Sequence, residues 1–260
     1  ARTLYEFLKS DYAIYGEGEE SLCQLLQALS HNSSLETIPG LIYQSSNTTI
    51  VNDRLAVAKD LDLEFDDNLV DFYWQHSGML NIQTKRGCPF HCVYCTYPVI
   101  EGKNVRTLNT DKIVKTLVHL YKNKGIDYVF FTDSVFNLHN GYNRELAEKI
   151  IASGISIKWG GYFNFANLDK EMLALLKKSG LVHIEFGTES LCDTTLKTYG
   201  KSFIMDDVYR ISSYCNELDI DYAHFLIMAG YGETDDTANQ TFENSKKIGP
   251  TVFFPFVGMR

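Results

Sequence analysis

The sequence has no long apolar run and no excess of basic residues. A helix that crosses a bilayer needs about 20 apolar residues. No stretch approaches that length, and no charged and then apolar leader opens the chain. The 24 lysines and arginines are outnumbered by 33 aspartates and glutamates, for a formal net charge of −9. Because phosphate contacts dominate nucleic-acid affinity, this balance argues against a nucleic-acid partner. We also expect no membrane span.

The sequence lacks the cysteine pattern of a secreted, disulfide-bonded domain. Six cysteines occur, and Cys23, Cys192 and Cys215 are scattered along the chain. This distribution predicts a reducing, cytoplasmic location. We expect the scattered thiols to be small buried hydrophobic groups. With 45% hydrophobic residues, a chain of 260 residues can form one large α/β domain and a small appendage.

The other three cysteines lie close together, as Cys88-x3-Cys92-x2-Cys95. Thiolates are soft ligands that favour iron–sulfur clusters or zinc. A structural zinc ion and an electron-carrying [4Fe–4S] cluster each take four protein ligands. The loop is therefore one ligand short, which leaves a coordination position open. Two alternatives remain, a zinc site with His91 as fourth ligand and an electron-transfer cluster completed by a distant cysteine.

Strand and helix patterns alternate from Met79 onward. We expect strands at 79–84, 128–132, 156–160, 182–186, 222–228 and 252–256, and helices at 111–122, 144–153, 169–178, 206–218 and 234–248. Glycines at positions 125, 154 and 180 follow three of these helices, as C-terminal caps do. Thr110 or Asp111 can cap the start of the first helix.

Repeated βα units predict parallel strands joined by right-handed crossovers. Six strands and five helices are too few for a closed eight-unit barrel. We therefore predict an α/β fold built on a partial six-stranded (β/α)6 TIM-like barrel. An open, doubly wound sheet is the alternative. In both folds, ligands gather at the carboxyl ends of the strands.

The residues before the barrel divide into two parts. Residues 1–30 contain a short strand, a turn and a leucine-rich helix that cannot bury their own apolar faces, so we expect their partners upstream of Ala1. Residues 31–77 are polar and irregular, with a small hairpin between Ile38 and Val51, and are predicted to be a linker. Residues 78–260 then form the core, which is expected to be truncated at its C-terminus.

Polar residues or glycines follow three of the predicted strands. Thr132-Asp133-Ser134 follows the second strand and could hold an ammonium or carboxylate group. Glu189-Ser190 follows the fourth, where the carboxylate could bridge two ribose hydroxyls or cap the next helix. Gly230 to Glu233 follows the fifth, where glycine permits close approach of a planar ligand. His183 and His224 lie on strands four and five, and either could face the barrel interior.

Together these motifs resemble the radical S-adenosylmethionine (SAM) superfamily over roughly residues 79–256. The cysteine spacing, with an aromatic residue before the last thiol, is similar to that family's cluster loop. The resemblance implies that Cys88, Cys92 and Cys95 bind three irons of a [4Fe–4S] cluster and that SAM chelates the fourth. The SAM contacts that it implies are Tyr94 in the cluster loop, Thr132, Asp133 and Ser134 at the methionine amino group, Glu189 and Ser190 at the ribose, and Gly230 and Glu233 near the adenine. The family's usual Gly-Gly-Glu is not spelled out at the second strand.

A narrower resemblance lies upstream. Tyr15-Gly16-Glu17-Gly18-Glu19-Glu20, followed by Ile38-Pro39-Gly40-Leu41, resembles the junction after the Rossmann-like domain of cobalamin-binding radical SAM proteins. It implies that residues 1–30 are the end of a B12-binding domain. Cobalamin would then be a further cofactor, held mostly by residues outside this chain. The segments Thr96–Gly102 and Phe131–Asn137 resemble a branch with members linked to lipid biosynthesis.

The resemblance implies a radical SAM enzyme. In that family an external donor such as flavodoxin or ferredoxin reduces the cluster, and cleavage of SAM yields a 5′-deoxyadenosyl radical that takes a hydrogen atom from substrate. We predict cobalamin-dependent methylation, or related radical chemistry, on a small-molecule or lipid-type substrate. The alternatives are a methylthiotransferase-like modifier of tRNA or protein and a non-catalytic metal-binding module. No residue is assigned a catalytic role.

Overall fold

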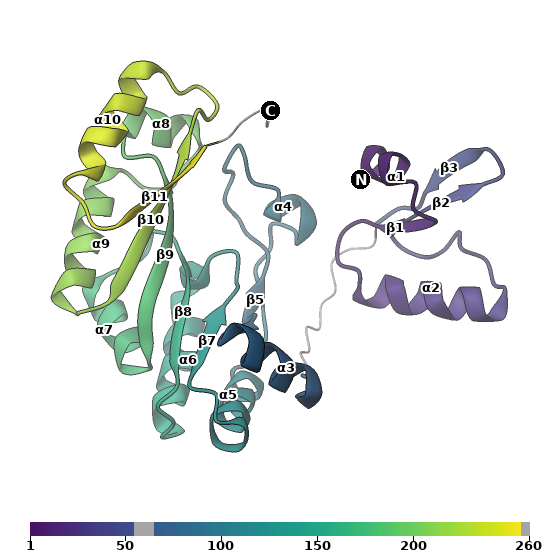
Figure 1. Ribbon diagram of the computed structural model, residues 1–260, viewed down its shortest axis with the longest axis horizontal. Coiled ribbons are helices and arrows are strands. Elements are labelled where there is room, and N and C mark those ends of the chain that lie inside the picture. The colour runs from purple at the N-terminus through teal and green to yellow at the C-terminus, as the bar shows by residue number, and fades with distance from the viewer. Residues whose placement is uncertain (55–64, 256–260) are drawn as a thin grey trace.

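The computed structural model describes residues 1–54 and 65–255, which form a small N-terminal unit and a larger core (Figure 1). Parts of the expected linker and of the sixth predicted strand lie outside the described residues. The elements of the N-terminal unit are α1 (Arg2–Leu8), β1 (Tyr12–Ile14), α2 (Glu19–His31), β2 (Leu41–Ser45) and β3 (Thr48–Val51).

The N-terminal unit has a core of its own. β1 pairs antiparallel with β2, and β2 pairs with β3, so the predicted hairpin is confirmed. Leu25 and Ala28 of α2 pack against Leu41 and Tyr43 of β2. The expectation that β1 and α2 find their partners only upstream is wrong, because β2 and β3 complete this sheet from beyond the boundary placed at residue 30. The exposed side of α2 still carries leucines, namely Leu22, Leu26 and Leu29.

The larger core is built on a six-stranded parallel sheet. In spatial order its strands are β4 (Leu80–Ile82), β7 (Tyr128–Phe131), β8 (Lys158–Phe163), β9 (Leu181–Glu189), β10 (Asp221–Met228) and β11 (Thr251–Pro255). All six correspond to predicted strands. The spatial order follows the chain order without a reversal, which is the order of a barrel-type sheet and excludes the doubly wound alternative. In the described ranges, β4 and β11 form the two edges and are not paired with each other.

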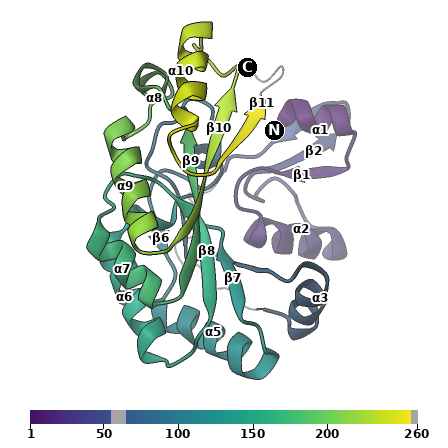
Figure 2. The same cartoon turned by 60° about the vertical axis from the view of Figure 1, so that its left-hand side comes forward.

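The predicted helices cover one face of this sheet, as Figure 1 and Figure 2 show. They are α5 (Thr110–Lys124), α6 (Asn140–Ala152), α7 (Lys170–Lys178), α9 (Met205–Glu217) and α10 (Asp235–Ser245). The N-terminal unit lies on the other side of the sheet in both views. Further helical elements were not predicted, namely α3 (Asp67–Ser77), α4 (Tyr97–Ile100), the 3₁₀ turn η1 (Phe136–Leu138) and α8 (Asp193–Thr198).

Side-chain caps explain two of the differences from the sequence prediction. The N-cap of α5 is Asn109, whose side chain accepts hydrogen bonds from the amides of Asp111 and Lys112. The expected caps, Thr110 and Asp111, lie inside the helix instead. Asp66 caps α3 in the same way, through the amides of Asn68 and Leu69. Carboxylates and amides at the N-cap satisfy free helical N–H groups, so a segment that looked irregular begins a helix.

Alternation along β9 separates the two faces of the sheet. Ile184, Phe186 and Thr188 are fully buried under the helices. His183 and Glu185 alternate with them and are only half-buried on the opposite, open face. Successive residues of a strand point to opposite faces. The open face therefore carries polar groups, and the carboxyl ends of its strands lead to the loops described next.

Candidate cluster and cofactor site

The three clustered cysteines lie on a loop beyond the carboxyl end of β4. The chain passes from β4 into β5 (Lys85–Arg86), which pairs antiparallel with β6 (Arg106–Thr107). Gly87 directly follows β5 with a left-handed φ of +93°, and a Cβ there would lie 2.2 Å from the Asn104 carbonyl oxygen. Glycine is the residue that fits this turn. It directs the chain from the hairpin into Cys88.

The three thiols share one electrostatic neighbourhood. Cys88 is buried, whereas Cys92 and Cys95 are partly exposed. Burial raises the pKa of Cys88 and of Cys95, and nearby cysteines raise both pKa values further. The Lys201 ammonium acts in the opposite direction on the pKa of Cys95. Within residues 1–54 and 65–255, no three Cys, His, Asp or Glu side chains are grouped as metal ligands, so the structure shows the neighbourhood of the thiols and not a ligand geometry.

Lys201 is the strongest candidate for a functional residue that the sequence analysis missed. Its Nζ donates hydrogen bonds to Tyr94 Oη at 2.7 Å and to the Gly187 carbonyl at 2.8 Å. It also lies 3.5 Å from Glu189 Oε1, and its side chain is only 4% exposed. Lys201 therefore joins the cysteine loop to the end of β9. A single lysine in a loop gives no sequence signal, and only its partners identify it.

Tyr94 and Glu189 are neighbours in the structure. Burial raises the pKa of Tyr94 and the Glu189 carboxylate raises it further, so the phenol stays protonated. Glu189 ends β9 with a left-handed φ of +68°, which is uncommon for a residue other than glycine. The alternative of a helix-capping carboxylate does not hold, because the N-cap of α8 is Cys192. The Glu189 side chain instead faces the cysteine loop.

Ser190 points away from this group. It is fully buried, and its Oγ lies 2.9 Å from Thr241 Oγ1 in α10. This contact attaches α10 to the end of β9. The expected contact of Ser190 with a ribose gains no support from the geometry.

The loop after β10 packs over Tyr199. A Cβ at Gly230 would lie 1.9 Å from Tyr199 Oη, so the space that the glycine leaves is filled by this phenol. Glu233 Oε2 accepts a hydrogen bond from the Ala229 amide at 2.6 Å and stabilises the same loop. Tyr199 Oη is buried without a hydrogen-bond partner among the described residues. Burial, with carboxylates nearby, raises the pKa of Tyr199 to about 12.

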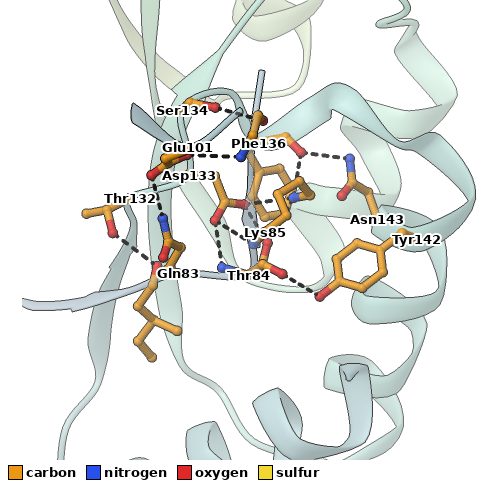
Figure 3. A network of polar contacts seen from close by, with 12 residues as sticks. Gln83, Thr84, Lys85, Glu101, Thr132, Asp133, Ser134, Phe136, Tyr142 and Asn143 are labelled. Carbon is orange, nitrogen blue, oxygen red and sulfur yellow. Dashed lines mark hydrogen bonds and ion pairs between the residues drawn. The ribbon is translucent and has the colours of Figure 1, made fainter. Parts of the chain in front are cut away.

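Asp133 is engaged with the protein and not with open space (Figure 3). Its carboxylate is fully buried and lies 2.7 Å from Nζ of Lys85, which is fully buried as well. The carboxylate also accepts hydrogen bonds from the amides of Thr84, at 2.6 Å, and of Lys85, at 3.1 Å. Lys85 was missed because a lysine is ordinarily exposed, even within a strand.

Thr132 and Ser134 flank Asp133 and are half-buried. The Thr132 amide donates to the Ile82 carbonyl at 2.9 Å, which extends the pairing of β4 with β7. Ser134 Oγ donates to the Gly87 carbonyl at 3.3 Å, at the root of the cysteine loop. Both hydroxyls lie at the carboxyl edge of the sheet, where the resemblance placed the SAM amino group.

The two strand histidines have opposite surroundings. His224 is fully buried between Thr188 Oγ1, at 2.8 Å, and Ser212 Oγ, at 3.2 Å. Burial lowers the pKa of His224 to about 4, so it is a neutral core residue. His183 lies on the open face, with Nδ1 3.1 Å from Tyr128 Oη and Nε2 3.4 Å from Glu185 Oε1.

The Gly-Glu-Gly-Glu turn of the N-terminal unit contacts the hairpin of β5 and β6, whose strands flank the cysteine loop. Arg106 of β6 donates to Glu17 Oε2 at 3.0 Å, and Arg86 of β5 lies 2.6 Å from Glu19 Oε1. Beside these contacts, residues of the turn and of the hairpin line a cleft of about 480 Å³. It is lined by Ile14, Gly16, Glu17, Gly18, Glu19, Leu22, Gln83, Arg86, Ile100 and Glu101. This motif therefore has a structural partner in the core.

The fold and the site together define a class of protein. A parallel βα sheet with its strands in sequential order, followed at its first strand by a three-thiol loop, is the architecture of an α/β enzyme that binds its cofactors beyond the strand ends. The chain belongs to the radical SAM superfamily, whose family model matches residues 82–244.

The chain is also similar in sequence to proteins with assigned names. The chain is 25% identical to an uncharacterized methyltransferase of Pyrococcus horikoshii, over 86% of this chain and 56% of that protein. It is also 25% identical to the hopanoid C-3 methylase of Methylococcus capsulatus, over 84% of this chain and 42% of that protein.

Among solved structures, the chain resembles TsrM of Kitasatospora setae, a radical SAM methyltransferase solved with its tryptophan substrate and a SAM analogue bound. The TM-score is 0.84 at 22% identity, covering 99% of this chain and 53% of TsrM. A second TsrM structure, with cobalamin and a [4Fe–4S] cluster bound, gives a TM-score of 0.83 at 21% identity, covering 97% of this chain and 52% of TsrM. The chain thus spans about half the length of the proteins it matches. Across the described residues, no helix combines the length and apolar character needed to cross a membrane.

Proposed function

We propose that the protein binds a [4Fe–4S] cluster through Cys88, Cys92 and Cys95 and cleaves SAM at the open iron. The observation that carries this proposal is the position of the three-thiol loop, which lies beyond the first strand of a radical SAM sheet and beside Lys201. Three thiolates supply a soft donor set for an iron–sulfur cluster and leave one iron for another ligand. The zinc alternative gains nothing from His91, which is exposed.

The surrounding residues position SAM. When bound, the cluster and SAM supply a carbon-centred radical, and the protein contributes orientation and exclusion of water. Glu189 can accept hydrogen bonds from ribose hydroxyls, while Lys201 fixes the positions of Glu189 and Tyr94. Thr132 and Ser134 present hydroxyl groups at the methionine end of the site. Each group belongs to a strand end or to a loop that the strands anchor.

The substrate lies on the open face of the sheet in this proposal. Phe130 and Tyr162 of β7 and β8 pack edge to face there, with ring centroids 4.9 Å apart. Burial raises the pKa of Tyr162, and the nearby Glu185 carboxylate and Tyr97 phenol raise it further, so these groups are neighbours. Burial raises the pKa of Tyr97 of α4, and Glu101 and Cys95 nearby raise it further. An aromatic floor with one carboxylate, beside the cluster loop, suits an apolar small molecule or a lipid-type substrate.

Cobalamin is proposed as a further cofactor and methyl transfer as the reaction. Support comes from TsrM, whose cobalamin-bound form shares the fold of nearly the whole chain, and from the names of the relatives. Residues 1–51 would then adjoin a cobalamin-binding domain, and an external donor such as flavodoxin or ferredoxin would supply the electron. A non-catalytic metal-binding module is not favoured by these comparisons.

Anaerobic reconstitution with iron and sulfide tests the proposal. We expect about four irons and four sulfides per chain, and 5′-deoxyadenosine and S-adenosylhomocysteine when SAM and a reductant are added. Replacement of any of the three loop cysteines by alanine should abolish both cluster and products. Cys23→Ala is the matched control, because Cys23 is exposed and distant in sequence. One zinc per chain without sulfide, or a confirmed cluster that yields neither product, would overturn the proposal.

A further inference from the structure

We infer that the buried Lys85–Asp133 pair is a positioning device for the cysteine loop and that Asp133 does not hold the SAM amino group. This inference rests on the proposed function, because the loop is taken to bind the cluster. The role of the pair in the apo-protein follows from its contacts alone (Figure 3). Lys85 and Asp133 are positioning residues, since neither is placed to touch a reacting atom.

The acceptor positions of Asp133 are all used. Oδ1 accepts from the amides of Thr84 and Lys85. Oδ2 accepts from Thr84 Oγ1 and from Lys85 Nζ. An ionised carboxylate offers about four lone-pair positions, and four donors fill them here. Because Asp133 is also fully buried, no acceptor remains for the ammonium group of SAM.

The donors of Lys85 are used just as completely. Its Nζ donates to Thr84 Oγ1 at 2.8 Å, to Asp133 Oδ2 at 2.7 Å and to the Phe136 carbonyl at 2.9 Å. An ammonium group has three N–H donors. The same nitrogen lies 4.4 Å from the centre of the Phe136 ring, a cation–π contact. A buried charge persists only when it is paired and hydrogen-bonded in this way.

This pair is connected directly to the cysteine loop. Lys85 begins β5, and Gly87 and Cys88 follow at the end of that strand. Ser134, the neighbour of Asp133, donates to the Gly87 carbonyl. Glu101 Oε2 accepts from the Gly87 amide at 3.0 Å. Asp133 and Ser134, which follow the end of β7, therefore hold the backbone at the start of the cysteine loop. Loss of the Lys85–Asp133 pair would free Cys88, the first cluster thiol, to move.

Three variants separate positioning from SAM binding. Asp133→Asn and Lys85→Met each leave the charge of the other partner buried without a counter-charge, so both should unfold at lower temperature than the wild-type apo-protein. The double variant K85M/D133N removes both charges and should recover most of that loss. It still lacks the Lys85 ammonium, which joins the start of β5 to Asp133 and to the Phe136 carbonyl, so its iron affinity should be roughly 10-fold weaker than that of the wild type, as is typical when a residue supporting a metal ligand is lost.

The readouts are thermal unfolding of the apo-protein, iron and sulfide content after reconstitution, and the EPR spectrum of the reduced cluster with and without SAM. Lys170→Met and Glu217→Gln are matched controls, because that ion pair is exposed, and neither should alter any readout. The inference is overturned if D133N unfolds and loads iron as the wild type does but loses the SAM-induced EPR change. It is also overturned if K85M and D133N leave apo-protein unfolding unchanged. Failure of the wild type to load a cluster refutes the proposed function instead, and the unfolding data still decide the role of the pair.

Discussion

Tyr94 Oη lies 2.7 Å from Lys201 Nζ, although 107 positions separate the two residues in sequence. The same ammonium lies 5.3 Å from the centre of the Tyr94 ring. Tyr94 stands between the second and third clustered cysteines, and its ring meets Tyr199 edge to face at 5.9 Å. The middle of the cysteine loop is therefore held by the segment that follows α8, while its root is held by β7.

Replacement of Lys201 by methionine should weaken SAM binding. Loss of a hydrogen bond to a charged group costs about 1.5–3 kcal/mol, so we expect a SAM dissociation constant roughly 10- to 100-fold higher. EPR titration of the reduced, reconstituted protein with SAM measures this constant. Lys197→Met is the control, because Lys197 is exposed on α8. Unchanged SAM affinity in K201M would show that Lys201 contributes to packing in the protein and not to SAM binding.

Replacement of Gly87 by alanine should impair the cysteine loop. The new Cβ would stand 2.2 Å from the Asn104 carbonyl, in a left-handed backbone conformation. We expect a loss of about 1–3 kcal/mol in the free energy of unfolding and less iron per chain. Gly154→Ala is a matched control, since Gly154 has a φ of +69° but a Cβ added there would meet no atom within 4 Å. Equal iron content in G87A and G154A would contradict the prediction.

Replacement of Glu17 by glutamine should loosen the N-terminal unit from the core. The side chains of Glu17 and Arg106 are only 11% and 12% exposed, so the variant leaves a largely buried guanidinium poorly paired. We expect a loss of about 1–3 kcal/mol in the free energy of unfolding and faster amide exchange in residues 1–51. Glu6→Gln, in the exposed pair with Arg2, is the control and should change neither quantity. Unaltered amide exchange in E17Q would contradict the prediction that the Glu17–Arg106 pair joins the N-terminal unit to the core.

His224 should make the protein less stable in acid. Burial lowers its folded-state pKa to about 4, whereas an unfolded chain has a histidine pKa of about 6.5. The unfolded state therefore binds the proton first. The contribution of His224 is present above pH 6.5 and is lost as pH falls toward 4, by about 3 kcal/mol at most. Urea unfolding of wild type and His224→Gln between pH 4 and 8 measures this, and the variant should show the shallower dependence. Parallel curves would show that His224 does not contribute.

Local features of the fold were predictable from sequence. The six strands, five long helices and small hairpin followed from apolar periodicity and turn residues, because both depend on neighbours in the chain. Helices whose starting caps are not recognised, such as α3 with Asp66, escape this reasoning. The sequence left two alternatives for the sheet, a partial barrel and an open doubly wound sheet, and the sequential strand order shows the barrel-type arrangement.

The candidate site was predictable only in part. Cys88, Cys92 and Cys95 are recognisable by their spacing, and their role stays a prediction until a cluster is measured. Asp133 was expected to contact the amino group of SAM but forms a buried ion pair with Lys85. His183 and His224 look alike in sequence, yet the alternation of strand faces placed one on the open face and the other in the core.

The sequence by itself determined a βα repeat, a three-thiol loop after its first strand and a glycine-rich N-terminal turn. Tertiary structure alone decided which distant groups meet them, namely Lys85 with Asp133, Lys201 with Tyr94, and Glu17 with Arg106. The physical reason is that a lone lysine or arginine has no periodicity to read. Its charge becomes significant only when folding removes water and places it against a carboxylate, a phenol or a carbonyl from another strand end.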